Sequence, residues 1–178
     1  LCISCLLGCF FTCTTTLRAQ TIYALSGGNL TSFNAAAPAL LLSNTTISGV
    51  DADYEVSGLD FRPATGELYA LGYDQATGSA RLYTVNKTTA VATAIGAAAV
   101  TLDAGMGKIG FDFNPTVDRI RITGSSNSNY RMHPVTGALV SVDGDLSFAP
   151  TDVNAAVNPS VGAVAYTNSY IGATSTTL

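Results

Sequence analysis

The sequence predicts an all-β protein built from antiparallel four-stranded units of about 50 residues each. From residue 21 onward, short apolar runs alternate with turns rich in Gly, Asn, Pro and Thr. The motif Gly-x-Asp-Phe-x-Pro occurs at residues 58–63 and again 52 residues later, at 110–115. Charged residues make up 11% of the chain, less than half of the usual share of about 25%, which argues against a coiled coil. We therefore expect a β-propeller-like fold whose three to four blades form an incomplete ring.

The first 19 residues are typical of a signal peptide, which precedes one domain at residues 20–178. The apolar stretch 1–11 has the length of a signal-peptide core and is too short to cross a bilayer. All four cysteines lie in this leader: Cys2, Cys5, Cys9 and Cys13. A membrane anchor, a CxxC metal or redox site and a lipoprotein modified at Cys9 are the alternatives. We expect a secreted or cell-surface protein whose mature chain has no transmembrane span.

The unit that begins with the first motif can be divided into four strands and three turns. Pro63 suits the second position of a turn, and Gly66 suits the positive φ at its end, where the second copy has Asp118. We expect each strand to turn one face inward and the other, more polar face outward. The predicted strands are 58–61, 68–71, 81–85 and 90–95, and the predicted turns are 62–66, 74–79 and 86–89.

Further copies of the unit are weaker. Residues 22–25 (IYAL) match 68–71 (LYAL), and another apolar strand head is expected at Gly162, again 52 residues after Gly110. Pro38 argues against a helix over the apolar stretch 34–42 and favours an extended loop or an edge strand. The residues that we expect in the core are Phe61, Leu68, Phe113 and Ile120.

The strings GLDFRPATGELYALG, RLYTVN, GFDFNPTVDRIRI and AYTN resemble the family described as domain of unknown function DUF4394. The resemblance covers residues 20–178. It implies a secreted or surface-located bacterial protein with a propeller-like fold, and it supplies no catalytic residues. Members of the family typically continue with further repeats, so the resemblance also implies that this chain is a fragment.

Composition excludes a nucleic-acid partner that is bound through its phosphates, because eight basic against twelve acidic residues give a net charge of −4. Asp60 and Asp112 recur in the motif. One interpretation is a pair of ligand-binding or catalytic carboxylates, and the other is an Asp that accepts backbone hydrogen bonds at its strand or turn. The spacing between paired acids in glycosidases, about 5 to 10 Å, distinguishes the two.

Two groups of acids suit a calcium ion through their hard oxygen ligands, although neither has the glycine and glutamate of an EF-hand. The simpler interpretation is that these acids are solvated loop residues and that the protein has no cofactor. The alternative is a bound Ca²⁺. The candidate ligands are Asp51, Asp53, Glu55, Asp143 and Asp145.

Basic candidates for binding are Arg62, Arg119 and Arg121. The two arginines in Asp118-Arg119-Ile120-Arg121 point to the same face, where they would either pair with Asp112 or Asp118 or bind an anionic glycan. His133 is the single histidine, so a Ser-His-Asp triad would have to use it, but the sequence contains no Gly-x-Ser-x-Gly motif for the nucleophile. We therefore interpret His133 as a turn residue.

Two functions follow as hypotheses. The first is a non-catalytic secreted or cell-surface module with a binding or structural role, whose partner is a surface glycan or protein. The second is an extracellular hydrolase or lyase that uses Asp60 and Asp112 as paired acids, with or without Ca²⁺.

Overall fold

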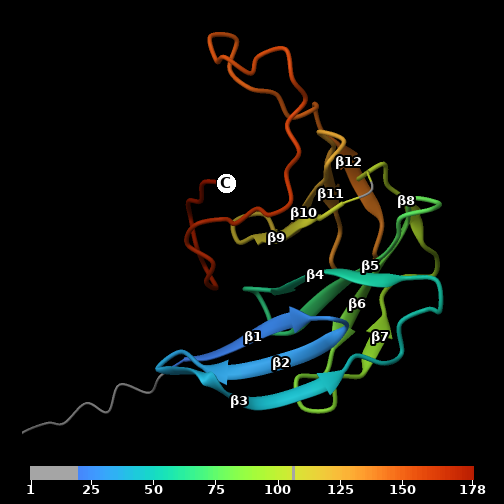
Figure 1. Cartoon of the computed structure of the whole chain (residues 1–178), viewed down its shortest axis with the longest axis vertical. Coiled ribbons are helices and arrows are strands. Elements are labelled where there is room, and N and C mark those ends of the chain that lie inside the picture. Colours follow the sequence, from blue (N-terminus) through green and yellow to red (C-terminus); the bar gives the residue numbers. More distant parts are fainter. Residues whose placement is uncertain (1–19, 106) are drawn as a thin grey trace, which may run out of the picture.

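Three antiparallel sheets follow one another along the chain (Figure 1). The computed structural model describes residues 20–105 and 107–178, so the leader and its cysteines lie outside the described residues. Within the described ranges there are twelve strands and no helix, and hence no helix that could cross a membrane. The prediction of an all-β, antiparallel fold is confirmed.

The first sheet has the strand order β1-β2-β3. Gly27 and Gly28, with φ of 55° and 80°, form the two-residue turn between the first two strands, which requires a positive φ at both positions. Pro38 lies in an edge strand, as expected, where the missing N–H breaks no interior ladder. The bounds are β1 Thr21–Ser26, β2 Asn29–Asn34 and β3 Ala37–Thr46.

The second sheet has the order β4-β5-β6-β7, and β8 pairs with the other end of β6. Its strands begin and end within a few residues of the predicted positions. The bounds are β4 Glu55–Phe61, β5 Leu68–Asp74, β6 Ser79–Val85, β7 Ala92–Ala94 and β8 Val100–Thr101.

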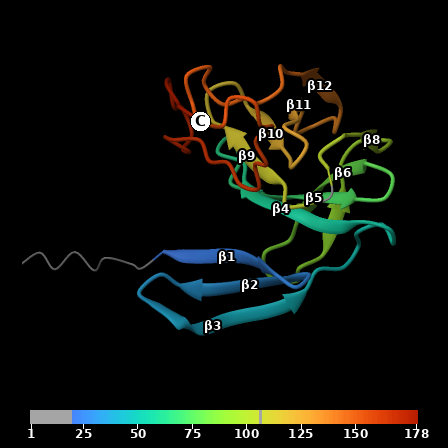
Figure 2. The same cartoon turned by 45° about the horizontal axis from the view of Figure 1, so that its top comes forward.

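The third sheet has the order β9-β10-β11-β12, so the second copy of the motif forms the same kind of strand pair as the first. After β12, residues 143–178 contain no strand and return along the side of β9 (Figures 1 and 2). The strand expected at Gly162 is therefore wrong: residues 162–166 lie next to β9, but their backbone forms no strand ladder with it. The bounds are β9 Gly110–Asn114, β10 Arg119–Thr123, β11 Asn129–Met132 and β12 Leu139–Val142.

The core consists of two apolar layers, one on each face of the second sheet. Tyr69 and Leu71 of β5 belong to the layer shared with the third sheet, whereas Leu68 and Ala70 belong to the layer shared with the first. The expectation of one polar face is wrong for β5, because a sheet stacked on both sides buries both sets of alternating side chains.

Of the four predicted core residues, three are buried, with exposed fractions of 0–2%. Phe61 is only half-buried and packs at the margin of the layer between the first two sheets. The buried three are Leu68, Phe113 and Ile120.

Candidate functional site

The glycine of the recurring motif allows the following segment of chain to approach closely. A Cβ at Gly58 of β4 would lie 2.5 Å from the Cβ of Phe111 in β9. A Cβ at Gly110 of β9 would lie 3.1 Å from the carbonyl carbon of Ala163. Glycine is required at such positions because any side chain would push the two segments apart.

The aspartate of the motif hydrogen-bonds the backbone of that same following segment. Asp60 Oδ2 accepts the N–H of Phe113 at 2.8 Å, and Asp112 Oδ2 accepts the N–H of Tyr166 at 2.7 Å. Asp60 Oδ1 accepts the adjacent N–H of Phe61 at 2.7 Å as well. The carboxylates thus bond backbone amides, but the amides belong mainly to the neighbouring sheet or segment and not to the local turn.

The two carboxyl groups lie near enough for each to affect the ionisation of the other. Burial, reinforced by the Asp60 carboxylate, raises the pKa of Asp112 to about 7. Burial likewise raises the pKa of Asp60, against the opposing effect of its two amide donors. Two neighbouring acids cannot both ionise cheaply, so the ionisation of the pair is shifted to higher pH. The sequence placed these residues in equivalent positions but could not show that they lie near each other.

A second link between the sheets is an ion pair between turns. Arg62 donates from Nε and Nη2 to the two carboxylate oxygens of Asp118, at 2.9 and 2.5 Å. Hydrogen bonds from Arg62 hold the pKa of Asp118 below its usual range. Asp118 has a φ of 50° where Gly66 has 71°, which confirms their equivalence in the turn. The expected pairing of Asp118 with Arg119 or Arg121 is wrong, because the ion-pair partner of Asp118 is Arg62, which follows β4 in the neighbouring sheet.

Arg119 faces its own turn. Its Nη1 donates to the backbone carbonyls of Val117 and Asp118, at 3.3 and 2.8 Å. It therefore closes the turn that precedes β10 and lies apart from the ion pairs described above and below.

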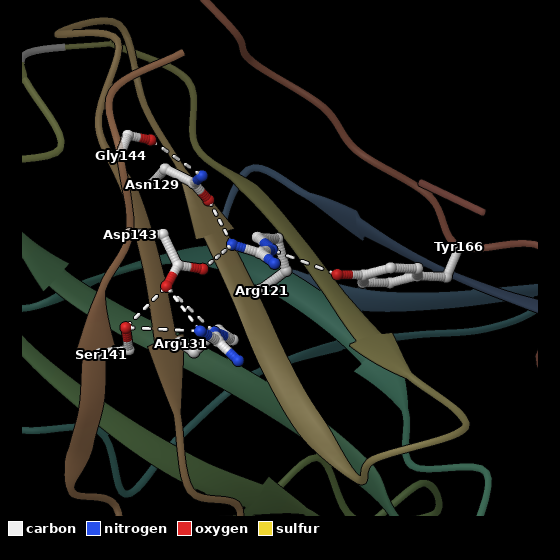
Figure 3. Close-up of polar contacts among 7 residues, drawn as sticks. All are labelled: Arg121, Asn129, Arg131, Ser141, Asp143, Gly144 and Tyr166. Atoms are coloured by element: carbon white, nitrogen blue, oxygen red, sulfur yellow. Dashed lines mark hydrogen bonds and ion pairs between the residues drawn. The ribbon is translucent and has the colours of Figure 1, made fainter. Parts of the chain in front are cut away.

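Arg121 belongs to a polar cluster on the third sheet (Figure 3). Arg121 and Arg131 are direct cross-strand neighbours, and Asp143 lies between their guanidinium groups, 2.5 and 2.7 Å from them. Hydrogen bonds from Arg131, from a serine hydroxyl and from Arg121 hold the pKa of Asp143 far below its usual range. Arg121 donates in addition to the Tyr166 hydroxyl at 3.1 Å and to Asn129.

Tyr166 connects this cluster to the acid pair, since its backbone bonds Asp112 and its hydroxyl bonds Arg121. The sequence analysis missed this role. The only available signal was the AYTN string at the third 52-residue position. Asp143, expected as a calcium ligand, is instead the counter-ion of two arginines.

The candidate calcium ligands do not converge. Asp51 accepts hydrogen bonds from Arg81 at 2.9 Å and from the Tyr83 hydroxyl at 3.0 Å, which lower its pKa. Among residues 20–105 and 107–178 no three acids, histidines or cysteines gather around a possible cation position. The remaining candidates are all exposed: Asp53, Glu55 and Asp145.

His133 is a turn residue, as predicted. Its Nδ1 accepts the N–H groups of Val135 and Thr136, at 3.2 and 3.4 Å. Asn86 does the same for Thr88 and Thr89 in the corresponding turn of the second sheet. The ring nitrogen therefore replaces the side-chain oxygen of an Asx-turn.

A cavity of about 310 Å³ lies where β1, β4, β9 and residues 162–164 meet. No sequence pattern pointed to it, because its walls come from four distant segments. They are residues 23–25 of β1, 57–59 of β4, Ile109 and Phe111 at β9, and 162–164.

A family model described as a domain of unknown function (DUF4394) matches residues 29–178 of the chain. The comparisons with curated proteins and with solved structures gave no match.

Proposed function

The chain belongs to the DUF4394 family, and we propose that it is an exported, non-catalytic module of the β-propeller type that acts by binding a surface partner. The observation that carries the proposal is the use of both recurring carboxylates to hold backbone amides of the next segment. Acids engaged in this way stabilise the architecture, and they are not free to bind a substrate.

The propeller arrangement is supported by the way the sheets stack. The first strands β4 and β9 lie next to each other, and at both copies the Gly and the Asp of the motif contact the segment that follows. The 52-residue offset supports a repeated unit that buries its faces only against its neighbours.

Export is supported by the apolar leader and by the low charge of the chain. Binding is supported by the cavity between β1, β4, β9 and residues 162–164, because ligand sites commonly form where several elements converge. Its walls are mixed, with the apolar Leu59 and Phe111 beside the polar Ser57.

Substitution of Asp112 tests the structural role of the acid pair. Asp112→Ala removes the acceptor of the Tyr166 N–H and should lower the free energy of unfolding by about 1–2 kcal/mol. Asp112→Asn keeps an acceptor oxygen and removes the neighbouring charge, so it should be close to neutral at pH 7. Asp145→Asn, in an exposed loop, is the matched control. Denaturant unfolding followed by circular dichroism measures all three variants.

The same variants should differ in their pH dependence. The pKa of Asp112 is about 7 in the folded chain against an ordinary value of 3.8, so the native state holds more protons between these limits. Lowering the pH from 7 to 5 should therefore stabilise the protein. If the folded protein held one extra proton throughout these two pH units, its free energy of unfolding would rise by about 2.7 kcal/mol. Partial solvent exposure of Asp112 reduces the expected gain to about 1 kcal/mol. Asp112→Asn should abolish this gain. An Asp112→Ala variant as stable as the parent protein would contradict the structural role.

A paired-acid hydrolase or lyase is the second candidate, and the pKa of Asp112 near 7 favours it, since general acids operate close to the working pH. Assays with nitrophenyl glycosides and with polygalacturonate decide between the two. Turnover by the parent protein that Asp112→Asn abolishes, without loss of stability, would establish the enzyme. We expect no turnover with either substrate class.

A further inference from the structure

β1 corresponds to the second strand of its sheet and not to the first. Tyr23 of β1 packs edge-on against Phe61 of β4, with ring centroids 5.6 Å apart and an interplanar angle of 70°. Tyr69 of β5 packs in the same way against Phe113 of β9, at 5.1 Å and 81°. Because β5 is a second strand and β9 the first strand of the following sheet, β1 is related to β4 as β5 is to β9.

In the described part of the chain no first strand lies beside β1, so this position is an open sheet edge. In the second sheet, Tyr69 pairs in register with Asp60 of the first strand β4. In the first sheet, β1 is an edge strand, and among the described residues only β2 pairs with it. An open edge carries unpaired N–H and C=O groups that can pair with another strand.

The amide of Phe61 marks where the aspartate of such a strand would bind. The N–H of Phe113 and the N–H of Tyr166 each bond the Asp of the preceding first strand. The equivalent N–H of Phe61 bonds the carboxylate of its own neighbour, Asp60. Phe61 is also half-buried, whereas Phe113 is 0% exposed. Both differences fall at the same end of the stack of sheets.

The space next to this edge is hollow. Tyr23, Ala24 and Leu25 of β1 form one wall of the 310 Å³ cavity, and Leu59 of β4 lies on another. At the other two junctions, a motif glycine faces the residue that is equivalent to Leu59. Gly58 faces Phe111 at one junction, and Gly110 faces Ala163 at the other. A strand added to β1 would need a glycine there for the same reason.

We propose that the free edge of β1 binds an extended polypeptide of the type Gly-x-Asp-Phe-x-Pro as an added antiparallel strand. Its Asp lies opposite Tyr23 and accepts the N–H of Phe61, and its Gly faces Leu59. Backbone ladder bonds supply affinity in this mode of recognition, and the Gly and Asp supply specificity. The inference rests on the proposed function, since it names the class of partner for a propeller-type module.

The test uses a fluorescently labelled synthetic peptide with the sequence of residues 109–116, IGFDFNPT, and the whole chain. Anisotropy should report saturable binding. A peptide with Ala in place of the Asp should bind about tenfold more weakly, the effect of losing a charge-assisted hydrogen bond worth about 1.4 kcal/mol. A peptide with Val in place of the Gly should also bind more weakly, because its side chain would meet Leu59.

Amide chemical shifts locate the peptide on the protein. The Phe61 amide should shift on titration, and the Phe113 amide, which is already bonded to Asp60, is the internal control. Absence of binding, equal binding of all three peptides, or shifts confined to the edge strands β3 or β12 would overturn the strand site. If Asp112→Ala is destabilising as expected, any of these outcomes leaves the proposed function intact. If Asp112→Ala is as stable as the parent protein, the proposed function itself fails.

Discussion

Substitution of Gly58 by alanine tests whether the motif glycine sets the distance between neighbouring sheets. The added Cβ would lie 2.5 Å from Cβ and 2.7 Å from Cγ of Phe111, and neither atom is at the flexible end of its side chain. The strands must therefore separate. Overpacking of this kind costs about 1–3 kcal/mol. The alanine also restricts the unfolded chain, which offsets about 0.4–1 kcal/mol. We expect Gly58→Ala to lose about 1–2 kcal/mol net.

Gly144→Ala is the matched control, because no atom lies within 4 Å of the added Cβ and the residue does not have a positive φ. It should stay within about 0.5 kcal/mol of the parent protein or gain slightly. Denaturant unfolding of both variants, followed by tyrosine fluorescence since the chain has no Trp, gives the comparison. Equal stability of the two variants would refute the close-approach role of Gly58.

Two further predictions concern the charged residues. Asp143→Ala leaves the largely buried Arg121 without its counter-ion and should lower the free energy of unfolding, measured by thermal unfolding, by about 2–3 kcal/mol. The pKa of Asp143 is lowered in the folded chain, so the stability that this carboxylate contributes is present above its unfolded pKa and is lost as the pH falls below that value. The stabilities of the variant and the parent protein should therefore become equal in acid. Millimolar Ca²⁺ should leave the melting temperature unchanged, because Asp51 and Asp143 already form ion pairs with arginines. A rise of several degrees in the melting temperature that is lost in Asp51→Asn would instead show a calcium site.

Local patterns predicted the strands of the second and third sheets well. Alternating apolar residues and turn residues act over a few positions, so the β4–β5 hairpin, the edge strand with Pro38 and the positive φ of Asp118 follow from neighbouring residues alone. The prediction of a polar outer face failed at β5. Residues within a strand do not show how many sheets will stack on it.

The candidate site divides along the same line. The sequence by itself determined that Asp60 and Asp112 are equivalent, that Gly precedes each of them, and that His133 belongs to a turn. Only the tertiary structure decided that the two carboxyl groups lie near each other, that Arg62 pairs with Asp118, and that the Asp143 side chain neutralises two arginines. These partners lie far apart along the chain or in different sheets, and their contact depends on how closely the sheets stack. The distance between stacked sheets is set by glycines and side-chain volumes acting together, and no local pattern encodes it.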